Sequence, residues 1–191
     1  VFPENITIIG ARAFMGANIT GSLIIPNSVI EIESYAFASI SYLNGTLTLS
    51  KNLRNIGNSA FMNCNNLRGE LHLPNSLEVI EGNAFYICSG LTGELLLPTS
   101  LKQIGSYTFK SCSGFTGDLI IPDNIIECGS YAFENCNFGG KLVLSKNMKV
   151  IGDGAFASCG FKGKLEIPST VTTIGSAEFT NNNFITFKSF S

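Results

Sequence analysis

Apolar and polar residues follow one pattern that repeats along the whole chain every 23 or 24 residues. Its most regular position is a phenylalanine, which follows an alanine in most copies. The eight phenylalanines are Phe14, Phe37, Phe61, Phe85, Phe109, Phe133, Phe156 and Phe179. Self-similarity at a period of roughly 20 to 50 residues is the signature of a solenoid, in which each coil contacts only its neighbours. The pattern therefore predicts about eight stacked coils with a long regular surface, and no closed catalytic pocket.

Two short strands are predicted in each coil. One has a Leu-x-Leu pattern, as at residues 47–49, 71–73 and 142–144, and its two-residue period is that of a strand with one buried face. The other lies around residues 101–104 and their equivalents. Strands of equal phase in successive coils should pair in parallel, at a spacing of ~4.8 Å.

A turn and a short helical segment are expected after the second strand. Gly105 and Ser106 suit a tight turn, because glycine adopts conformations that other residues avoid. One helical turn would then carry Phe109 and Cys112 into the core. The predicted fold class is thus a solenoid of mixed α/β to mainly β type, with parallel sheets and short helical turns.

Residues 1–191 are expected to form one domain, because a coil of this size buries its apolar side only by stacking on its neighbours. No linker interrupts the repeat. Val1-Phe2-Pro3 aligns with Ile24-Ile25-Pro26, so the chain starts in mid-coil and we expect it to be part of a longer protein.

Composition agrees with a well-filled core, since 45% of the residues are hydrophobic and only 14% are charged. The net charge of −2 gives no basic footprint for nucleic acid. No segment approaches the ~20 consecutive apolar residues of a membrane-spanning helix.

Five of the six cysteines occupy one repeat position, three residues after the phenylalanine, namely Cys64, Cys88, Cys112, Cys136 and Cys159. Cys128 takes the place of a core isoleucine. Stacking brings equivalent residues within the Cα distance of disulfides, but their parallel Cβ vectors disfavour the required dihedral angle. Zinc sites typically use Cys-x-x-Cys pairs, and the chain has none. We therefore expect buried, reduced thiols that behave as small apolar side chains.

Candidates for catalysis are scarce. His72, the only histidine, lies between two leucines of a Leu-x-Leu pattern and should point outward, whereas the cysteines should point inward. A cysteine or serine nucleophile needs a base within reach. The motifs Gly-x-x-x-x-Gly-Lys, Gly-x-Ser-x-Gly and His-Glu-x-x-His are absent from the sequence. We expect no enzyme activity and no cofactor.

The outward position between the paired core residues is the main candidate for binding. It holds Ile24, Thr48, His72, Leu96, Ile120, Val143 and Glu166. Contiguous exposed apolar side chains mark interaction sites more often than isolated ones do. The alternative is that β-branched residues simply suit strands, or that another domain covers this face.

Charged residues flank this position, two residues earlier in each of five coils. They are Glu70, Glu94, Asp118, Lys141 and Lys164. Three carboxylates on adjacent coils would suit calcium. A solvated edge is the commoner meaning of such a charge run, and we expect no metal site.

Tyrosines and sequons add two further surface features. The tyrosines Tyr35, Tyr107 and Tyr131 precede their phenylalanines by two residues, and tyrosine is favoured at interfaces. Packing at the turn is the simpler explanation, because other copies carry asparagine or serine there. Asn-x-Thr sequons begin at Asn5, Asn18 and Asn44, and they would carry glycans only in a secreted eukaryotic protein.

The unit Leu-Pro-x-Ser-Leu-x-x-Ile-Gly-x-x-x-Phe-x-x-Cys-x-x-Leu resembles the Treponema-type leucine-rich repeat of BspA-like surface proteins, from Val1 to about Phe187. The sequence differs from the shorter common form by an inserted Gly-x pair, as in Gly93-Glu94 and Gly117-Asp118. The resemblance implies a right-handed, curved leucine-rich solenoid on the surface of bacteria or parasitic protozoa. It also implies adhesion to host proteins and other cells.

These features predict a non-enzymatic module, extracellular or at the cell surface, that presents one sheet face to a protein partner. The resemblance suggests a host extracellular-matrix or cell-surface protein. The residues expected to contact the partner are Ile24, Thr48, His72, Leu96, Ile120, Val143 and Glu166, with Glu70, Glu94, Asp118, Lys141 and Lys164 at their side. Two alternatives stay open, which are a passive spacer and a carbohydrate-binding module that uses the tyrosines.

Overall fold

The repeated isoleucine position forms the most continuous element of the structure, a parallel sheet with one short strand from each of eight coils. In the computed structural model, which describes residues 2–189, each strand has two residues. The strands are β1 (Ile8–Ile9), β3 (Glu31–Ile32), β5 (Asn55–Ile56), β7 (Val79–Ile80), β9 (Gln103–Ile104), β11 (Glu127–Cys128), β13 (Val150–Ile151) and β15 (Thr173–Ile174). Equivalent residues lie opposite each other, as Ile32 and Ile56 do. The prediction of parallel pairing between coils is confirmed.

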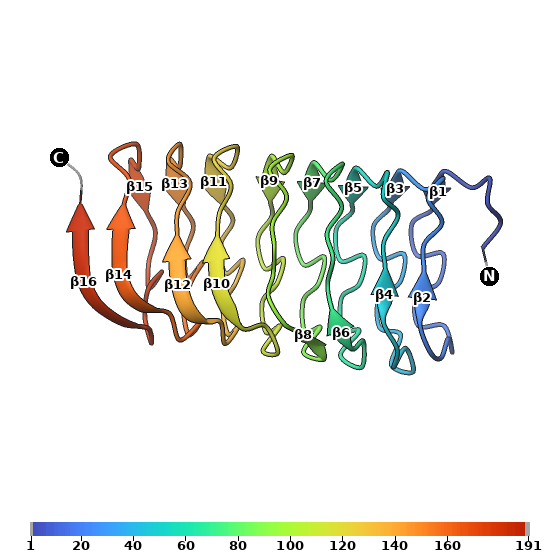
Figure 1. The fold of residues 1–191 in the computed structure, drawn as a ribbon. Coiled ribbons are helices and arrows are strands. Elements are labelled where there is room, and N and C mark those ends of the chain that lie inside the picture. Colours follow the sequence, from blue (N-terminus) through green and yellow to red (C-terminus); the bar gives the residue numbers. More distant parts are fainter. Residues whose placement is uncertain (1, 190–191) are drawn as a thin grey trace.

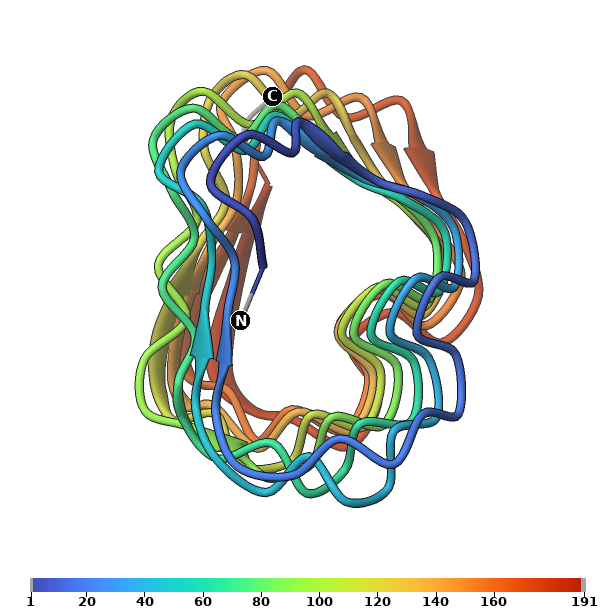
Figure 2. The same cartoon turned by 90° about the vertical axis from the view of Figure 1, so that its right-hand side faces the viewer.

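The second set of strands forms four separate pairs on another side of the coil (Figures 1 and 2). These strands are β2 (Leu23–Ile24), β4 (Leu47–Thr48), β6 (Gly69–Glu70), β8 (Leu91–Thr92), β10 (Gly117–Ile120), β12 (Gly139–Val143), β14 (Lys162–Ile167) and β16 (Asn183–Ser189). Each even-numbered strand pairs in parallel with one neighbour, and the pairs follow one another along the rod. The two ends of the described chain lie at opposite ends of this rod (Figure 1).

The strand expected at residues 71–73 is absent, although its side chains alternate as predicted. Leu71 is buried and His72 is exposed, but the ladder hydrogen bonds lie just before them, in β6 and β8. The inserted glycine that precedes each Leu-x-Leu segment here adopts a left-handed conformation, with φ of 81° at Gly69 and Gly93 and 88° at Gly117. In the next pair, β10 and β12, the register shifts between Gly117 and Leu119. Beyond this shift the ladder continues with Leu119 opposite Leu142 and Ile120 opposite Val143, so in this pair the Leu-x-Leu segment is a strand as predicted.

The expected helical turn is also absent, and residues 2–189 contain no helix. Successive amides in this segment point alternately out to the next coil and back into the turn. Tyr35 N and Phe37 N donate to carbonyls of the next coil at 2.9 and 2.8 Å, whereas Ala36 N bonds within the turn. This alternation requires left-handed residues at two sites of the coil, and Tyr35 and Ser39 have φ of 59° and 58°. A helix cannot form, because its amides would all bond within the segment.

The core is a column of phenylalanine rings along the solenoid axis. Phe37, Phe61, Phe85, Phe109, Phe133 and Phe156 are fully buried. Neighbouring rings are nearly parallel, with centroids 5.2–5.7 Å apart from Phe37 to Phe156. The view along the rod shows the backbones of successive coils superposed around one common interior (Figure 2). Each coil therefore supplies one layer of a core that no single coil could close.

Candidate functional site

The outward position forms a row of exposed side chains on the face of the even-numbered strands, and we call its seven residues the outward row. Its members are Ile24, Thr48, His72, Leu96, Ile120, Val143 and Glu166. Ile24, Leu96 and Ile120 are 65%, 68% and 58% exposed, and Val143 is 45% exposed. These values are high because the residues on either side of each member turn inward to the core, as Leu119 and Ile121 do around Ile120.

A second row, the charged row, runs beside it and consists of Glu70, Glu94, Asp118, Lys141 and Lys164, all exposed. A Cβ at Gly93 would lie 2.9 Å from Glu70 Cγ, and one at Gly117 would lie 3.0 Å from Glu94 Cγ. The two glutamates thus extend along the rod, each over the glycine of the next coil. Asp118 Oδ1 instead accepts a hydrogen bond from Lys141 N at 2.7 Å. The glycines that shift the register therefore also make room for the carboxylates.

The two ends of the charged row have ionic partners in the outward row. His72 Nε2 lies 3.5 Å from Glu70 Oε2, and Lys164 Nζ contacts Glu166 Oε1. Neither the Glu94 nor the Lys141 side chain makes an ion pair with any residue between 2 and 189. The middle of the row therefore keeps charges of both signs available for a ligand.

Three shallow depressions lie along these two rows. Leu96 borders two of them, of about 630 and 500 Å³, together with Glu94. Ile120 and Asp118 line the smaller of the two. The third, of about 750 Å³, is lined by Val143 together with Lys141 and Lys146 of the same coil and Lys164 of the next. Apolar side chains beside charged rims suit contact with another macromolecule through a broad surface.

The structure places all twelve predicted binding residues on one face and exposes each of them. Strand pairing puts Ile24 beside Thr48 and Ile120 beside Val143. Whether these residues bind a partner stays a prediction.

The tyrosines are engaged by the protein itself. The rings of Tyr107 and Tyr131 stack with centroids 5.1 Å apart, and Lys110 Nζ lies 5.3 and 5.0 Å from the two centroids. Lys110 also pairs with Glu134 at 2.5 Å, and hydrogen bonding to that carboxylate raises the pKa of Lys110. The far face of Tyr131 covers Gly154, where a Cβ would lie 2.6 Å from the ring. This cluster packs neighbouring turns against each other. Its contacts occupy ring faces of Tyr107 and Tyr131 on which a sugar would otherwise stack.

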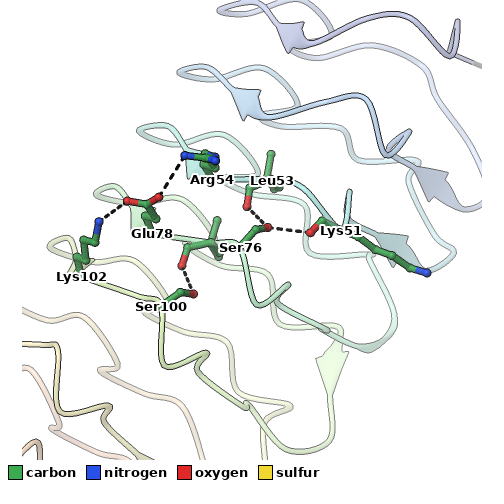
Figure 3. Close-up of polar contacts among 8 residues, drawn as sticks. Lys51, Leu53, Arg54, Ser76, Glu78, Ser100 and Lys102 are labelled. Carbon is green, nitrogen blue, oxygen red and sulfur yellow. Dashed lines mark hydrogen bonds and ion pairs between the residues drawn. The ribbon is translucent and has the colours of Figure 1, made fainter.

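Sequence reasoning missed a charged ladder in the segment that leads into the eight-stranded sheet. Glu78 lies between Arg54 and Lys102, at 3.6 and 2.5 Å, on three successive coils (Figure 3). The hydrogen bond from Lys102 lowers the pKa of Glu78. The signal was present, because the three residues share one repeat position 24 residues apart.

Serines hold the coils together beside this ladder. Ser76 Oγ lies 2.8 and 2.7 Å from the carbonyl oxygens of Lys51 and Leu53, which share its one hydroxyl hydrogen, and Ser100 Oγ donates to Leu77 O at 2.7 Å (Figure 3). Each serine thus satisfies carbonyls of the preceding coil. This explains the serine in the Pro-x-Ser-Leu part of the repeat as a structural residue.

Groups that could perform chemistry are separated in the structure. The His72 side chain is 80% exposed. All six cysteines are buried as free thiols, which confirms that they belong to the core. Burial raises the pKa of Cys64 to about 11 and that of Cys112 to about 12. Among residues 2–189, no three histidine, cysteine or acidic side chains gather as metal ligands would.

The part of the chain that the structure describes contains no helix long and apolar enough to cross a membrane.

Solved structures of bacterial leucine-rich repeat proteins are similar to this chain. The leucine-rich repeat protein of T. pallidum is 27% identical, with a TM-score of 0.64, and the match covers 88% of this chain and 73% of that one. A leucine-rich cell surface protein from Faecalibacterium prausnitzii A2-165 is 24% identical, with a TM-score of 0.63. That match covers 92% of this chain but only 40% of the other, so the chain spans less than half of that protein.

A leucine-rich repeat protein from Bacteroides ovatus is 20% identical, with a TM-score of 0.58 over 95% of this chain and 63% of that one. This likeness and that of the Faecalibacterium protein show the fold alone. A comparison with curated proteins gives no match.

The repeat itself identifies the family. The family described as the BspA type leucine-rich repeat region matches residues 1–116 and 92–190, and these ranges together span nearly the whole chain. The chain belongs to the BspA-type leucine-rich repeat family.

Proposed function

We propose that this chain is a non-catalytic adhesion module, exposed outside the cell, that binds a protein partner through the outward row and the charged row. The observation that carries the proposal is the exposure of Leu96, Ile120 and Val143 on successive coils, at 68%, 58% and 45%. A soluble protein seldom leaves such a contiguous set of aliphatic side chains in water unless they contact something.

The surroundings of these residues support a protein as the partner. Depressions on either side of Leu96 accept protruding side chains, and charges of both signs border them. Protein interfaces combine an apolar centre with a charged or polar rim in this way. The described relative from Faecalibacterium prausnitzii is a cell surface protein, which supports the extracellular placement.

The test uses glutamate substitutions in the centre of the face. Leu96→Glu and Ile120→Glu should abolish binding to surfaces coated with purified extracellular-matrix proteins and to cultured cells. The melting temperature should stay unchanged, because both side chains project into solvent. Ile126→Glu is the matched control, since Ile126 is 52% exposed but lies in the segment leading into the eight-stranded sheet.

The outcomes separate this proposal from its two alternatives. Wild-type binding that both substitutions leave intact would refute the proposed surface. Absence of binding by the wild-type protein to every coated surface and cell type would favour the passive spacer. Binding to a glycan array that is lost on Tyr107→Ala, but kept on Leu96→Glu, would favour carbohydrate recognition.

A further inference from the structure

On this face, acidic side chains lie on one side of the coil that contains Asp118, and basic side chains lie on the other side. Along the charged row, Glu70 and Glu94 precede Asp118, whereas Lys141 and Lys164 follow it. Glu94 lies one coil before Asp118, and Lys141 lies one coil after it. Glu70 and Lys164 lie two coils before and two coils after it. A face of this kind is complementary to its own reversed copy.

The outward row follows the same arrangement. Among its last five members, from His72 to Glu166, Ile120 is the central one, with Leu96 and Val143 one coil away on either side. Two coils away lie His72 and Glu166, a potential cation and an anion. The centre of the face is thus apolar, and both of its ends are polar.

The two charges without an internal partner fit this symmetry. Glu94 and Lys141 make no ion pair within residues 2–189, and they lie one coil before and one coil after the centre. A two-fold axis along the strand of Ile120 would reverse the order of the coils and keep each row facing its own copy. It would therefore place Glu94 opposite Lys141 of a second copy, twice in each dimer.

We propose that this face binds a second copy of the chain in reversed coil order, with Leu96, Ile120 and Val143 at the centre. Ion pairs between Glu94 and Lys141, and between Glu70 and Lys164, flank this centre on both sides. The proposal rests on the proposed function, because it uses the same face, and it names one partner for it. Adhesion between two surfaces that carry the chain would follow directly.

One contact opposes this arrangement. The axis places the two copies of Asp118 opposite each other, and like charges across an interface are unfavourable. Four ion pairs of opposite charge stand against this single contact. Asp118 Oδ1 is also held by the Lys141 amide at 2.7 Å, which directs its carboxylate along the rod toward the next coil.

The size of the face sets the expected affinity. Five coils span only ~20 Å along the rod. This strip is smaller than the about 800 Å² per partner of a standard interface, so we expect a weak dimer that dissociates on dilution. Weak contacts of this kind become strong between surfaces that carry many copies.

Charge reversal at the two unpaired residues tests the proposal. Glu94→Lys and Lys141→Glu should each weaken self-association by about tenfold or more, because each change turns two attractive contacts into repulsive ones. An equimolar mixture of the two variants should dimerise as well as the wild type, since both contacts between residues 94 and 141 in the mixed dimer again join opposite charges. Sedimentation velocity from micromolar to millimolar protein concentration measures both effects. Added salt should weaken the wild-type dimer.

Controls with the same change of charge lie outside this face. Glu127→Lys and Lys149→Glu alter exposed residues in or beside β11 and β13 of the eight-stranded sheet, and they should leave self-association unchanged. A wild-type protein that stays monomeric at millimolar concentration would overturn the proposal. So would single variants that dimerise like the wild type, or a mixture that does not recover.

The outcome is distinguishable from failure of the proposed function. Loss of matrix or cell binding on Leu96→Glu, without any self-association of the wild type, would refute only the second copy as partner. Self-association without binding to any other protein would instead restrict the face to contacts between copies.

Discussion

Cys112 Sγ donates a hydrogen bond to the backbone carbonyl of Phe85, at 3.0 Å, and so connects one coil to the preceding one inside the core. The same bond recurs from Cys64, Cys88, Cys136 and Cys159 to the phenylalanine carbonyl one coil earlier, at 2.9–3.0 Å. Phe61 O, Phe85 O and Phe109 O also accept a backbone amide from within their own coil, at 3.0–3.2 Å, so the thiol is a second donor to each of them. The cysteine of the repeat therefore acts both as a small apolar side chain and as a donor.

Substitution of this thiol should reveal the hydrogen bond. Cys112→Ala leaves Phe85 O with only the backbone amide of Cys88 as a donor, at 3.1 Å, and should lower the free energy of unfolding by ~0.5–1.5 kcal/mol, the net contribution of one hydrogen bond. Cys112→Ser keeps a donor at the same place and should cost less. Urea unfolding measures both variants. Equal stability of the alanine variant and the wild type would show that the hydrogen bond contributes nothing.

Because the thiols are buried, we also expect the stability of the protein to depend on pH. The pKa of Cys112 is raised from 9.0 to about 12 in the folded state, because the core disfavours the thiolate. The folded state thus holds its proton more tightly than the unfolded state. This contribution to stability is complete below pH 9 and is lost as the pH rises from 9 toward 12.

Two measurements check this behaviour. The free energy of unfolding should fall as the pH rises above about 9, and a variant with Cys112→Ser should show a smaller fall. A thiol-specific disulfide reagent should leave the folded protein unmodified near neutral pH and should label it after denaturation. Rapid labelling of the native protein would contradict the buried ladder.

The phenylalanine column should be most sensitive in its middle. Phe109 is fully buried and stacks on Phe85 and Phe133, with centroids 5.4 and 5.5 Å apart. Phe109→Ala should cost ~3–5 kcal/mol. Phe14 is only half-buried, so Phe14→Ala should cost less, ~1–2 kcal/mol. Chemical denaturation of both variants tests the ranking, and equal losses would argue against a continuous column.

Substitution of Ser111 can distinguish the observed turn from the helical turn that the sequence suggested, because Ser111 has a positive φ of 62°. Glycine adopts this left-handed conformation without strain, so Ser111→Gly should raise the free energy of unfolding by ~0.5–1 kcal/mol. In a helix the same change would lower stability by a similar amount. Ser111→Val should destabilise, because a β-branched residue tolerates positive φ poorly. Thermal unfolding of the two variants distinguishes the two conformations.

The buried Glu178 side chain should lower the free energy of unfolding, and its substitution should raise it. It is 5% exposed, and its Oε1 has no hydrogen-bond partner among the described residues. Ala36, Ala60 and Ala132 fill the same repeat position in other coils. Glu178→Ala should therefore stabilise the protein by ~1–2 kcal/mol at neutral pH.

The pH dependence of this gain follows from the direction of the shift. Burial, and then the charge of Asp153, raise the pKa of Glu178 above 4.5. The favourable effect of the protonated carboxyl is complete below pH 4.5 and is lost as the pH rises through the raised value. The stability difference between Glu178→Ala and the wild type should therefore grow from acidic to neutral pH. A constant difference would contradict the assignment.

Much of the candidate site could be predicted from the sequence, because its residues repeat at one position. The alternation around Ile120 and Leu96 indicates which side chains point outward, and the structure exposes both. The ladder of Arg54, Glu78 and Lys102 was equally visible as a repeat but was missed, since charged residues on a surface usually need no explanation. The buried Glu178 was missed because it interrupts the pattern in one coil only.

The sequence by itself determined the solenoid, its period, its core positions and the face that carries the outward row, because each of these depends on one residue type recurring at a fixed interval. Only the tertiary structure decided how the backbone of each coil is bonded. The amides of Tyr35 and Phe37 bond the next coil, which requires left-handed residues where the sequence suggests a helical turn. Likewise, the strand register shifts after Gly117, and Glu70 and Glu94 extend over Gly93 and Gly117. Hydrogen bonds between coils depend on the neighbouring coil, and a local pattern does not contain that information.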